Sequence, residues 1–81
     1  MRIRVLVFAR LREILGESDA KLELPEGARI EDAWTALAAG HPALRAERSS
    51  TRAARNGRLA DFETALTDGD ELALLPPVGG G

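Results

Sequence analysis

Residues 66–81 read LTDGDELALLPPVGGG and carry the signals that decide the fold. Residues 67–70 (TDGD) are typical of a tight turn, and the apolar run at 71–75 predicts a strand immediately after it. Pro76 and Pro77 then stop the strand, because proline has no N–H to donate to a sheet. The sequence therefore predicts a strand that leads directly into a glycine-rich tail.

Two further strands are predicted in the first third of the chain. Residues 2–8 are rich in β-branched residues and place Ile3, Val5 and Val7 on one face, which indicates a central strand. Residues 20–24 alternate in the same way and are expected to pair with it as in a hairpin.

One long helix is predicted from residue 30 to Gly40, where apolar residues recur at the i, i+3, i+4 spacing. No side chain before residue 30 is a good N-cap, so only the periodicity defines where this helix starts. A short helix is indicated at residues 9–15, with Gly16 as a left-handed C-cap. The apolar stripe of the long helix consists of Ile30, Ala33, Trp34, Leu37 and Ala38.

Residues 43–54 give no clear pattern, since alanines and arginines dominate there. Asn56 and Gly57 favour a type I′ hairpin turn. The order of elements predicts an α+β domain in which one long helix packs across one face of a mixed sheet.

Composition excludes several classes of protein. The chain has 81 residues, no cysteine and a net charge of −2, which predicts one small domain without disulfides or thiolate chemistry. Without an apolar run of membrane-spanning length or a signal-peptide pattern, a cytoplasmic location without membrane contact is expected.

A basic segment stands out in the middle of the chain, and it can be a solvated face or a site for an acidic partner or nucleic acid. It contains Arg45, Arg48, Arg52, Arg55 and Arg58 against Glu47 alone.

No side chains form a recognisable catalytic or metal-binding motif. His41 is the only histidine and has no partners at triad spacing. Asp68, Asp70 and Glu71 lack the spacing of a calcium loop and are expected to shape a turn. We therefore expect no metal, no bound cofactor and no enzyme activity of the chain on its own.

The tail offers a different reactive group, the carboxylate of Gly81. Three glycines make a thread that can enter a narrow channel, and the two prolines direct it outward. A carboxylate that has been adenylated can exchange oxygen for sulfur and become a thiocarboxylate nucleophile. A frayed end or a cloning scar is the alternative explanation.

The chain resembles the small subunit of molybdopterin synthase, the MoaD family of ubiquitin-like β-grasp sulfur carriers. The resemblance lies in residues 7–13 (VFARLRE), 56–57 (NG) and 66–73 (LTDGDELA), together with PPV at 76–78 before the final glycines. It implies a ubiquitin-like β-grasp domain at residues 1–78 and a flexible tail at 79–81.

The resemblance also implies a reaction cycle. Gly81 would be adenylated with ATP by a ubiquitin-activating-like adenylyltransferase and converted to a thiocarboxylate by a sulfurtransferase. Val78, Gly79, Gly80 and Gly81 would then insert into the large subunit, in a heterotetramer of two small and two large subunits. Sulfur would pass to cyclic pyranopterin monophosphate to form the dithiolene of molybdopterin.

A partner surface is expected on the sheet face that the long helix leaves uncovered. Phe8 and Leu75 fall on that face by strand alternation, and Leu59 is a candidate to join them. With Pro76 and Pro77, these residues form the predicted interface.

Two departures from the family pattern concern residues 52–55 (RAAR), which suit a buried strand poorly, and Gly79, where a Ser or Thr is usual.

Three alternatives stay open: a thiamine-pathway sulfur carrier, a protein modifier that forms isopeptide bonds, and a β-grasp nucleic-acid-binding module. The last is disfavoured because no aromatic residues accompany the arginines.

Overall fold

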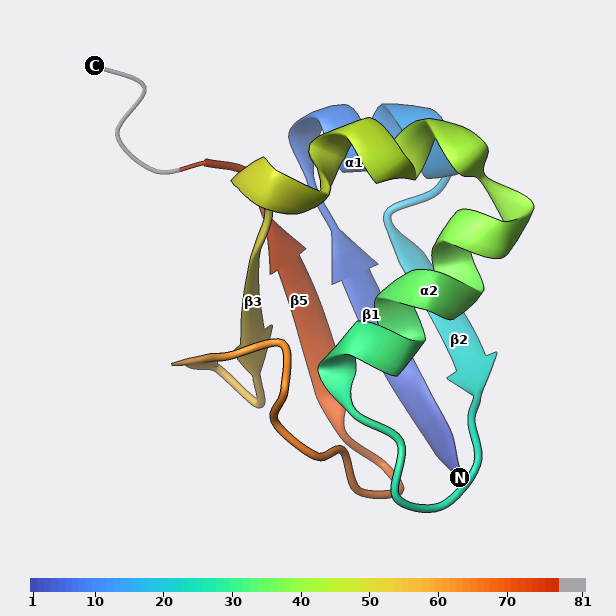
Figure 1. Cartoon of the computed structure of the whole chain (residues 1–81), viewed down its shortest axis with the longest axis vertical. Helices are drawn as coiled ribbons and strands as arrows, with labels where there is room; N and C mark the ends of the chain where they lie inside the picture. The colour runs from blue at the N-terminus through green and yellow to red at the C-terminus, as the bar shows by residue number, and fades with distance from the viewer. Residues whose placement is uncertain (78–81) are drawn as a thin grey trace.

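The structure is a computed structural model that describes residues 1–77 (Figure 1). Its elements confirm the predicted α+β class, with a mixed sheet and one long helix. In chain order they are β1 (Arg2–Val7), α1 (Ala9–Leu15), β2 (Asp19–Glu23), α2 (Ile30–Gly40), the 3₁₀ segment η1 (Pro42–Ser50), β3 (Arg52–Arg55), β4 (Arg58–Ala60) and β5 (Glu71–Leu75).

The five strands form one sheet in the order β2-β1-β5-β3-β4. β1 pairs with β2 in antiparallel fashion, as predicted, and with β5 in parallel. β1 is thus an inner strand, but the centre of the sheet belongs to β5, which has β1 on one side and β3 on the other. The strand that leads to the tail is therefore the most enclosed strand of the sheet.

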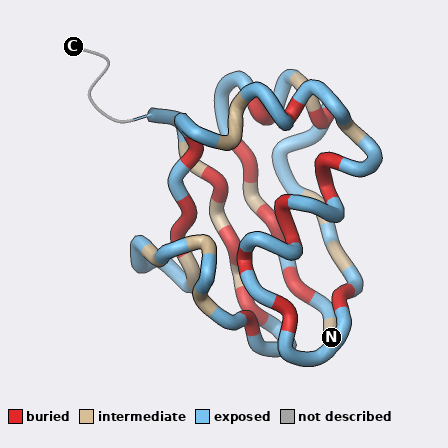
Figure 2. The backbone as a smooth tube through the Cα atoms, in the orientation of Figure 1, coloured by how far each residue is buried: buried red, intermediate tan, exposed pale blue. Residues whose placement is uncertain are grey.

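α2 crosses one face of the sheet (Figure 1). The residues of its predicted apolar stripe are all buried, as a helix with one apolar face against the core requires. Buried and exposed positions interchange along the tube of this helix in Figure 2. Its start at Ile30 is held by Asp32, whose side chain accepts a 2.8 Å hydrogen bond from the Arg29 backbone N–H. A carboxylate in the first helical turn also interacts favourably with the positive end of the helix dipole.

The core lies between this face of the sheet and the helices. Val5 and Leu72 are completely buried, and Val7 and Leu74 are each 1% exposed, so the buried positions of β1 and β5 face α2. The largest fully buried side chains are Ile3, Val5, Val7, Ile30, Leu44, Leu72 and Leu74.

The segment after α2 differs from the sequence interpretation. Residues 42–50 form a 3₁₀ segment that begins with Pro42 and buries Leu44. Residues 52–55, judged poorly suited to a buried strand, form β3, and Ala53 and Ala54 are 2% and 8% exposed. The backbone ladders with β4 and β5 fix this strand, so bulky apolar side chains are not required.

The turn between β3 and β4 confirms the type I′ prediction. Asn56 has φ 49° and Gly57 has φ 85°, and this turn type requires positive φ at both central residues. Gly16 ends α1 with φ 82°, as predicted. None of the helices within residues 1–77 combines the length and apolar character that crossing a bilayer requires.

Candidate functional site

The site begins where β5 leaves the sheet. Val7 pairs with Leu74 in the parallel ladder, and Arg52 lies opposite Leu75 in the antiparallel one, so the tail departs between the end of β1 and the start of β3. Pro76 and Pro77 follow and are exposed. The predicted tail residues Val78, Gly79, Gly80 and Gly81 lie outside the described residues.

An apolar surface extends from this exit across the face of the sheet opposite α2. Leu6 pairs with Ala73, Ala73 with Ala54, and Ala54 with Leu59, so one cross-strand row runs over four strands. Cross-strand neighbours on one face contact each other directly. We call this surface, together with the next positions along β1 and β5, the exit face: Leu6, Phe8, Ala54, Leu59, Ala73 and Leu75.

Two residues of the exit face are unusually exposed for large apolar side chains. Phe8 is 42% exposed and Leu59 is 66% exposed. Phe8 has extended φ and ψ of −136° and 161°, so it continues the alternation of β1 and falls on the face of Leu6. Leu75 is half-buried and falls on the face of Ala73. The structure thus places Phe8, Leu59 and Leu75 on the same face of the sheet.

The other half of the same sheet face is charged. Arg4 donates hydrogen bonds of 2.9 and 2.7 Å to Asp19, and its Nη1 lies 3.5 Å from a Glu71 carboxylate oxygen. Arg2 pairs with Glu23 at 2.8 Å. The hydrogen bond from Arg4 lowers the pKa of Asp19 below its usual value. Apolar surface is therefore confined to the half of this face from which the tail departs.

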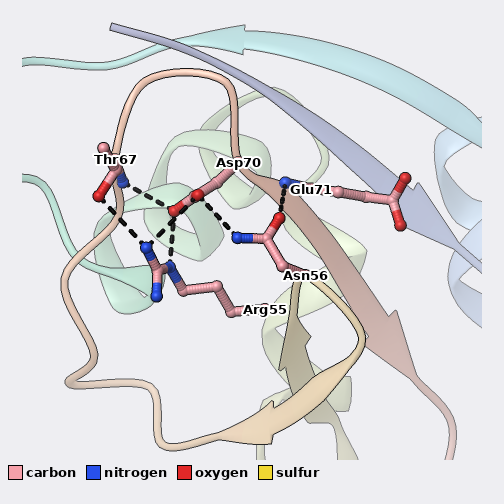
Figure 3. Close-up of polar contacts among 5 residues, drawn as sticks. All are labelled: Arg55, Asn56, Thr67, Asp70 and Glu71. Carbon is pink, nitrogen blue, oxygen red and sulfur yellow. Dashed lines mark hydrogen bonds and ion pairs between the residues drawn. The ribbon is translucent and has the colours of Figure 1, made fainter.

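The opposite end of β5 is held by a buried carboxylate, shown in Figure 3. Asp70 is buried and accepts hydrogen bonds from Arg55 Nε at 2.6 Å, Asn56 Nδ2 at 2.9 Å and the Thr67 backbone N–H at 2.7 Å. Asn56 Oδ1 also accepts a 2.9 Å hydrogen bond from the Glu71 backbone N–H. These contacts tie the β3–β4 turn to the first residue of β5.

The charge of Asp70 is stabilised by this surrounding network. Burial alone raises the pKa of a carboxyl group, but the hydrogen bonds from Arg55, Asn56 and Thr67 outweigh it, so the pKa of Asp70 lies below its usual value. The sequence interpretation gave Asp70 a role in shaping a turn. The structure confirms that role and adds the contacts to Arg55 and Asn56.

The remaining polar candidates have structural roles. His41 caps α2, where its backbone N–H donates to Leu37 and Ala38 and its carbonyl accepts from the Leu44 N–H. Within residues 1–77, no three His, Asp or Glu side chains are arranged to hold a metal ion. The arginines at 45–58 are distributed over η1, β3 and β4, and two of them, Arg48 and Arg55, pair with Glu31 and Asp70.

Sequence reasoning missed three members of the exit face: Leu6, Ala54 and Ala73. Strand alternation in the sequence places Leu6 on the face of Phe8, but the predicted interface did not include it. Ala54 and Ala73 become neighbours only through the β3–β5 register, which the sequence does not specify.

Comparison with known proteins identifies the family of the chain. The sequence profile of the ThiS family matches residues 5–81. A molybdopterin synthase sulfur carrier subunit from Chlamydomonas reinhardtii is 43% identical, with both chains covered completely. The chain belongs to the ThiS and MoaD family of ubiquitin-like proteins. Another relative in this family is small archaeal modifier protein 1 from Haloferax volcanii, which is 36% identical over 93% of this chain and 95% of its own.

Solved structures of related proteins have the same fold as this chain. A putative molybdopterin converting factor subunit 1 from Pyrococcus furiosus superposes with a TM-score of 0.87 at 31% identity, covering 96% of this chain and 99% of the other. A ubiquitin from Caldiarchaeum subterraneum superposes with a TM-score of 0.64 at 22% identity over 100% and 98% of the two chains. The ubiquitin-like β-grasp prediction is therefore confirmed.

One structural relative was solved with a protein bound. It belongs to a complex of subunits 1 and 2 of the molybdopterin-converting factor from Helicobacter pylori, and it superposes with a TM-score of 0.69 at 27% identity over both complete chains. In that relative, subunit 1 is therefore seen in a complex with subunit 2.

Proposed function

We propose that this chain is the sulfur carrier subunit of a molybdopterin synthase and that its working group is the carboxylate of Gly81. The observation that carries the proposal is the exit face. It is an exposed apolar surface that borders the point where β5 passes into Pro76 and Pro77. Sequence relatives named as sulfur carrier subunits support the same role.

The proposed chemistry needs no side chain of the carrier. A carboxylate oxygen of Gly81 attacks the α-phosphorus of ATP on an adenylyltransferase, and pyrophosphate leaves. Sulfur at the oxidation level of sulfide, delivered by a sulfurtransferase, then displaces AMP and gives the thiocarboxylate. This sulfur is a stronger nucleophile than the carboxylate oxygen, and it displaces an oxygen substituent from the side chain of cyclic pyranopterin monophosphate to form a thioester. Water then cleaves the bond between this sulfur and the Gly81 carbonyl, which leaves the sulfur on the pterin and restores the Gly81 carboxylate. A second carrier supplies the second sulfur of the dithiolene.

The exit face is the proposed contact with the large subunit of the synthase. Phe8, Leu59 and Leu75, with Pro76 and Pro77, would dock there, while residues 78–81 enter the partner's active site. Large exposed apolar side chains next to a reactive tail are typical of a protein interface. The complex of two subunits from H. pylori supports an assembly of this kind, and we propose a heterotetramer with two copies of each subunit.

Intact-mass spectrometry tests the carrier role. The chain is incubated with ATP, its activating enzyme and a sulfur source, beside a variant that lacks Gly81 and a reaction without ATP. We expect a mass gain that corresponds to one oxygen-to-sulfur exchange in the complete reaction only. No gain with enzymes shown to be active on another carrier would overturn the proposal.

The acceptor separates the molybdopterin pathway from the thiamine pathway. The thiocarboxylated chain is mixed either with the large subunit and the pterin precursor or with a thiazole synthase and its substrates. We expect the thiocarboxylate to be consumed only in the first mixture. Consumption in the second mixture alone would assign the chain to thiamine synthesis.

A protein-modifier role is a second candidate, because small archaeal modifier protein 1 is 36% identical to this chain. A modifier would link Gly81 to lysine side chains of other proteins. Peptide mass spectrometry of cell lysate for lysines that carry the C-terminal residues of this chain distinguishes the two roles. We expect no such adducts.

A further inference from the structure

Charge is distributed unevenly between the tail-exit end and the rest of the chain. Residues 8–13 and 42–52 contain five arginines and two glutamates, a formal charge of +3. The remaining residues contain six basic and eleven acidic side chains, a formal charge of −5, and together the two parts give the net −2. The molecule thus has a positive end although its overall charge is negative.

The fold brings these two segments together at the exit of β5. α1 and η1 lie across the end of the sheet from which β5 departs (Figure 1). Arg10 Nε of α1 lies 3.7 Å from Glu47 Oε2 of η1. Arg52, just after η1, is the register partner of Leu75, the last residue of β5.

Three arginines at this end are available to a partner. Arg12, Arg45 and Arg52 are exposed and form no ion pair within residues 1–77. We call them the exit arginines. Arg48 is different, because it binds Glu31 at 2.7 Å and lies over the Phe62 ring at 3.4 Å.

The arginines elsewhere on the sheet are mostly neutralised. Arg2, Arg4 and Arg55 each pair with a carboxylate of this chain. An exposed guanidinium group that is not neutralised by a nearby carboxylate contributes positive electrostatic potential to the surrounding solvent. The exit arginines therefore add an unbalanced positive field to the end that presents the tail.

We propose that the exit arginines contact an acidic surface of the large subunit around the opening that receives the tail. This inference rests on the proposed function. Arg52 flanks Leu75 of the exit face, so a partner that covers this face also reaches the arginine. Complementary charge accelerates association and orients the encounter, and the positive end makes the carrier approach with its tail first.

The same arginines fit nucleic acid poorly. Single-stranded binding surfaces combine positive charge with aromatic side chains on which bases stack. α1 and η1 contain no aromatic residue, and Phe8, which precedes α1, offers a single ring where such a surface needs a series of them.

Stopped-flow association of the chain with its large subunit tests the proposal. The variant Arg12→Glu/Arg52→Glu is compared with Lys21→Glu/Arg58→Glu, which changes the net charge equally at exposed positions away from α1 and η1. At low ionic strength we expect the association rate constant to fall about tenfold in the first variant and less than about threefold in the control. At about 0.5 M salt the difference should disappear, because screening shortens the range of the field.

A second exit variant, Arg12→Glu/Arg45→Glu, leaves β3 untouched and keeps the test valid if Arg52→Glu disturbs that strand. Equal rates in the exit and control variants would overturn the inference while leaving the carrier role intact. Absence of binding by the unmodified chain would overturn both. An unstructured RNA of mixed sequence that competes with the large subunit would also overturn it, in favour of a nucleic-acid site.

Discussion

The two ends of β5 are held in opposite ways. At its start, the buried Asp70 accepts three short hydrogen bonds from Arg55, Asn56 and Thr67. At its end, Leu75 is only half-buried, Pro76 is exposed, and the neighbouring Arg52 forms no ion pair within residues 1–77. The chain therefore concentrates its polar anchoring where β5 enters the sheet and leaves its exit accessible. Mutations at the two ends should separate stability from function.

The largest effect is expected at the anchored end. Asp70→Asn removes the charge that balances Arg55 and leaves a buried site with unmatched donors, so unfolding should become easier by about 3 kcal/mol. Urea denaturation measures this change. The control Asp61→Asn, at an exposed carboxylate without a side-chain partner within residues 1–77, should change stability by less than about 0.5 kcal/mol.

Asp70→Asn should not alter the reactivity of the tail once the protein is folded. Thiocarboxylate formation per folded molecule should equal that of the unmodified chain at a temperature well below its unfolding midpoint. A large loss of reactivity in the folded variant would contradict the separation between the two ends of β5.

Acid should remove the contribution of Asp70. Its pKa is lower in the folded than in the unfolded chain, so its stabilisation is fully present above the unfolded pKa of about 3.9. This stabilisation disappears as the pH falls through the folded pKa. The stability difference between the unmodified chain and Asp70→Asn should thus be constant from pH 6 to 7 and shrink below about pH 4. A difference that does not depend on pH would show that the charge of Asp70 is not the stabilising feature.

A smaller effect is expected at the exit. Replacing Pro76 and Pro77 by glycine gives the backbone at these positions more conformational freedom. The partner must then restrict that freedom when it binds, and the entropy lost weakens binding. We expect about a tenfold weaker Kd for the large subunit and a change in folding stability of less than about 0.5 kcal/mol. Isothermal titration calorimetry and thermal unfolding measure the two quantities. The matched control Pro25→Gly lies in an exposed loop far from the exit and should leave the Kd unchanged.

The smallest effect concerns Ala9, which follows Phe8 of the exit face. Ala9 has φ 48°, a conformation that costs a residue with a Cβ about 1–2 kcal/mol. Glycine removes that strain, but its greater freedom in the unfolded chain makes folding about 0.5–1 kcal/mol more costly. Ala9→Gly should therefore stabilise the protein by about 0.5 kcal/mol. In contrast, Ala36→Gly on the exposed side of α2 should destabilise it by about 1 kcal/mol. Equal destabilisation by both substitutions would contradict the strain at Ala9.

Several features of the fold could be predicted from local sequence patterns. The alternation in β1, the apolar stripe of α2 and the Asn56-Gly57 turn all agree with the structure. These signals depend on the period of a strand or helix and on the φ angles that a residue tolerates. The hairpin turn implied short strands around it, but the bounds and pairing of β3 were not predicted, because its residues carry neither signal and hydrogen bonds to β4 and β5 fix its position.

The sequence by itself determined the glycine-rich tail, the prolines before it, and the absence of cysteine and of a catalytic side-chain motif. Tertiary structure alone decided that β5 is the central strand and that Ala54 and Ala73 connect Phe8 and Leu75 to Leu59. It also decided that α1 and η1 lie together across the end of the sheet from which β5 departs, where Arg10 pairs with Glu47. The physical reason is that strand order and register depend on contacts between residues far apart in the chain, which no local periodicity encodes.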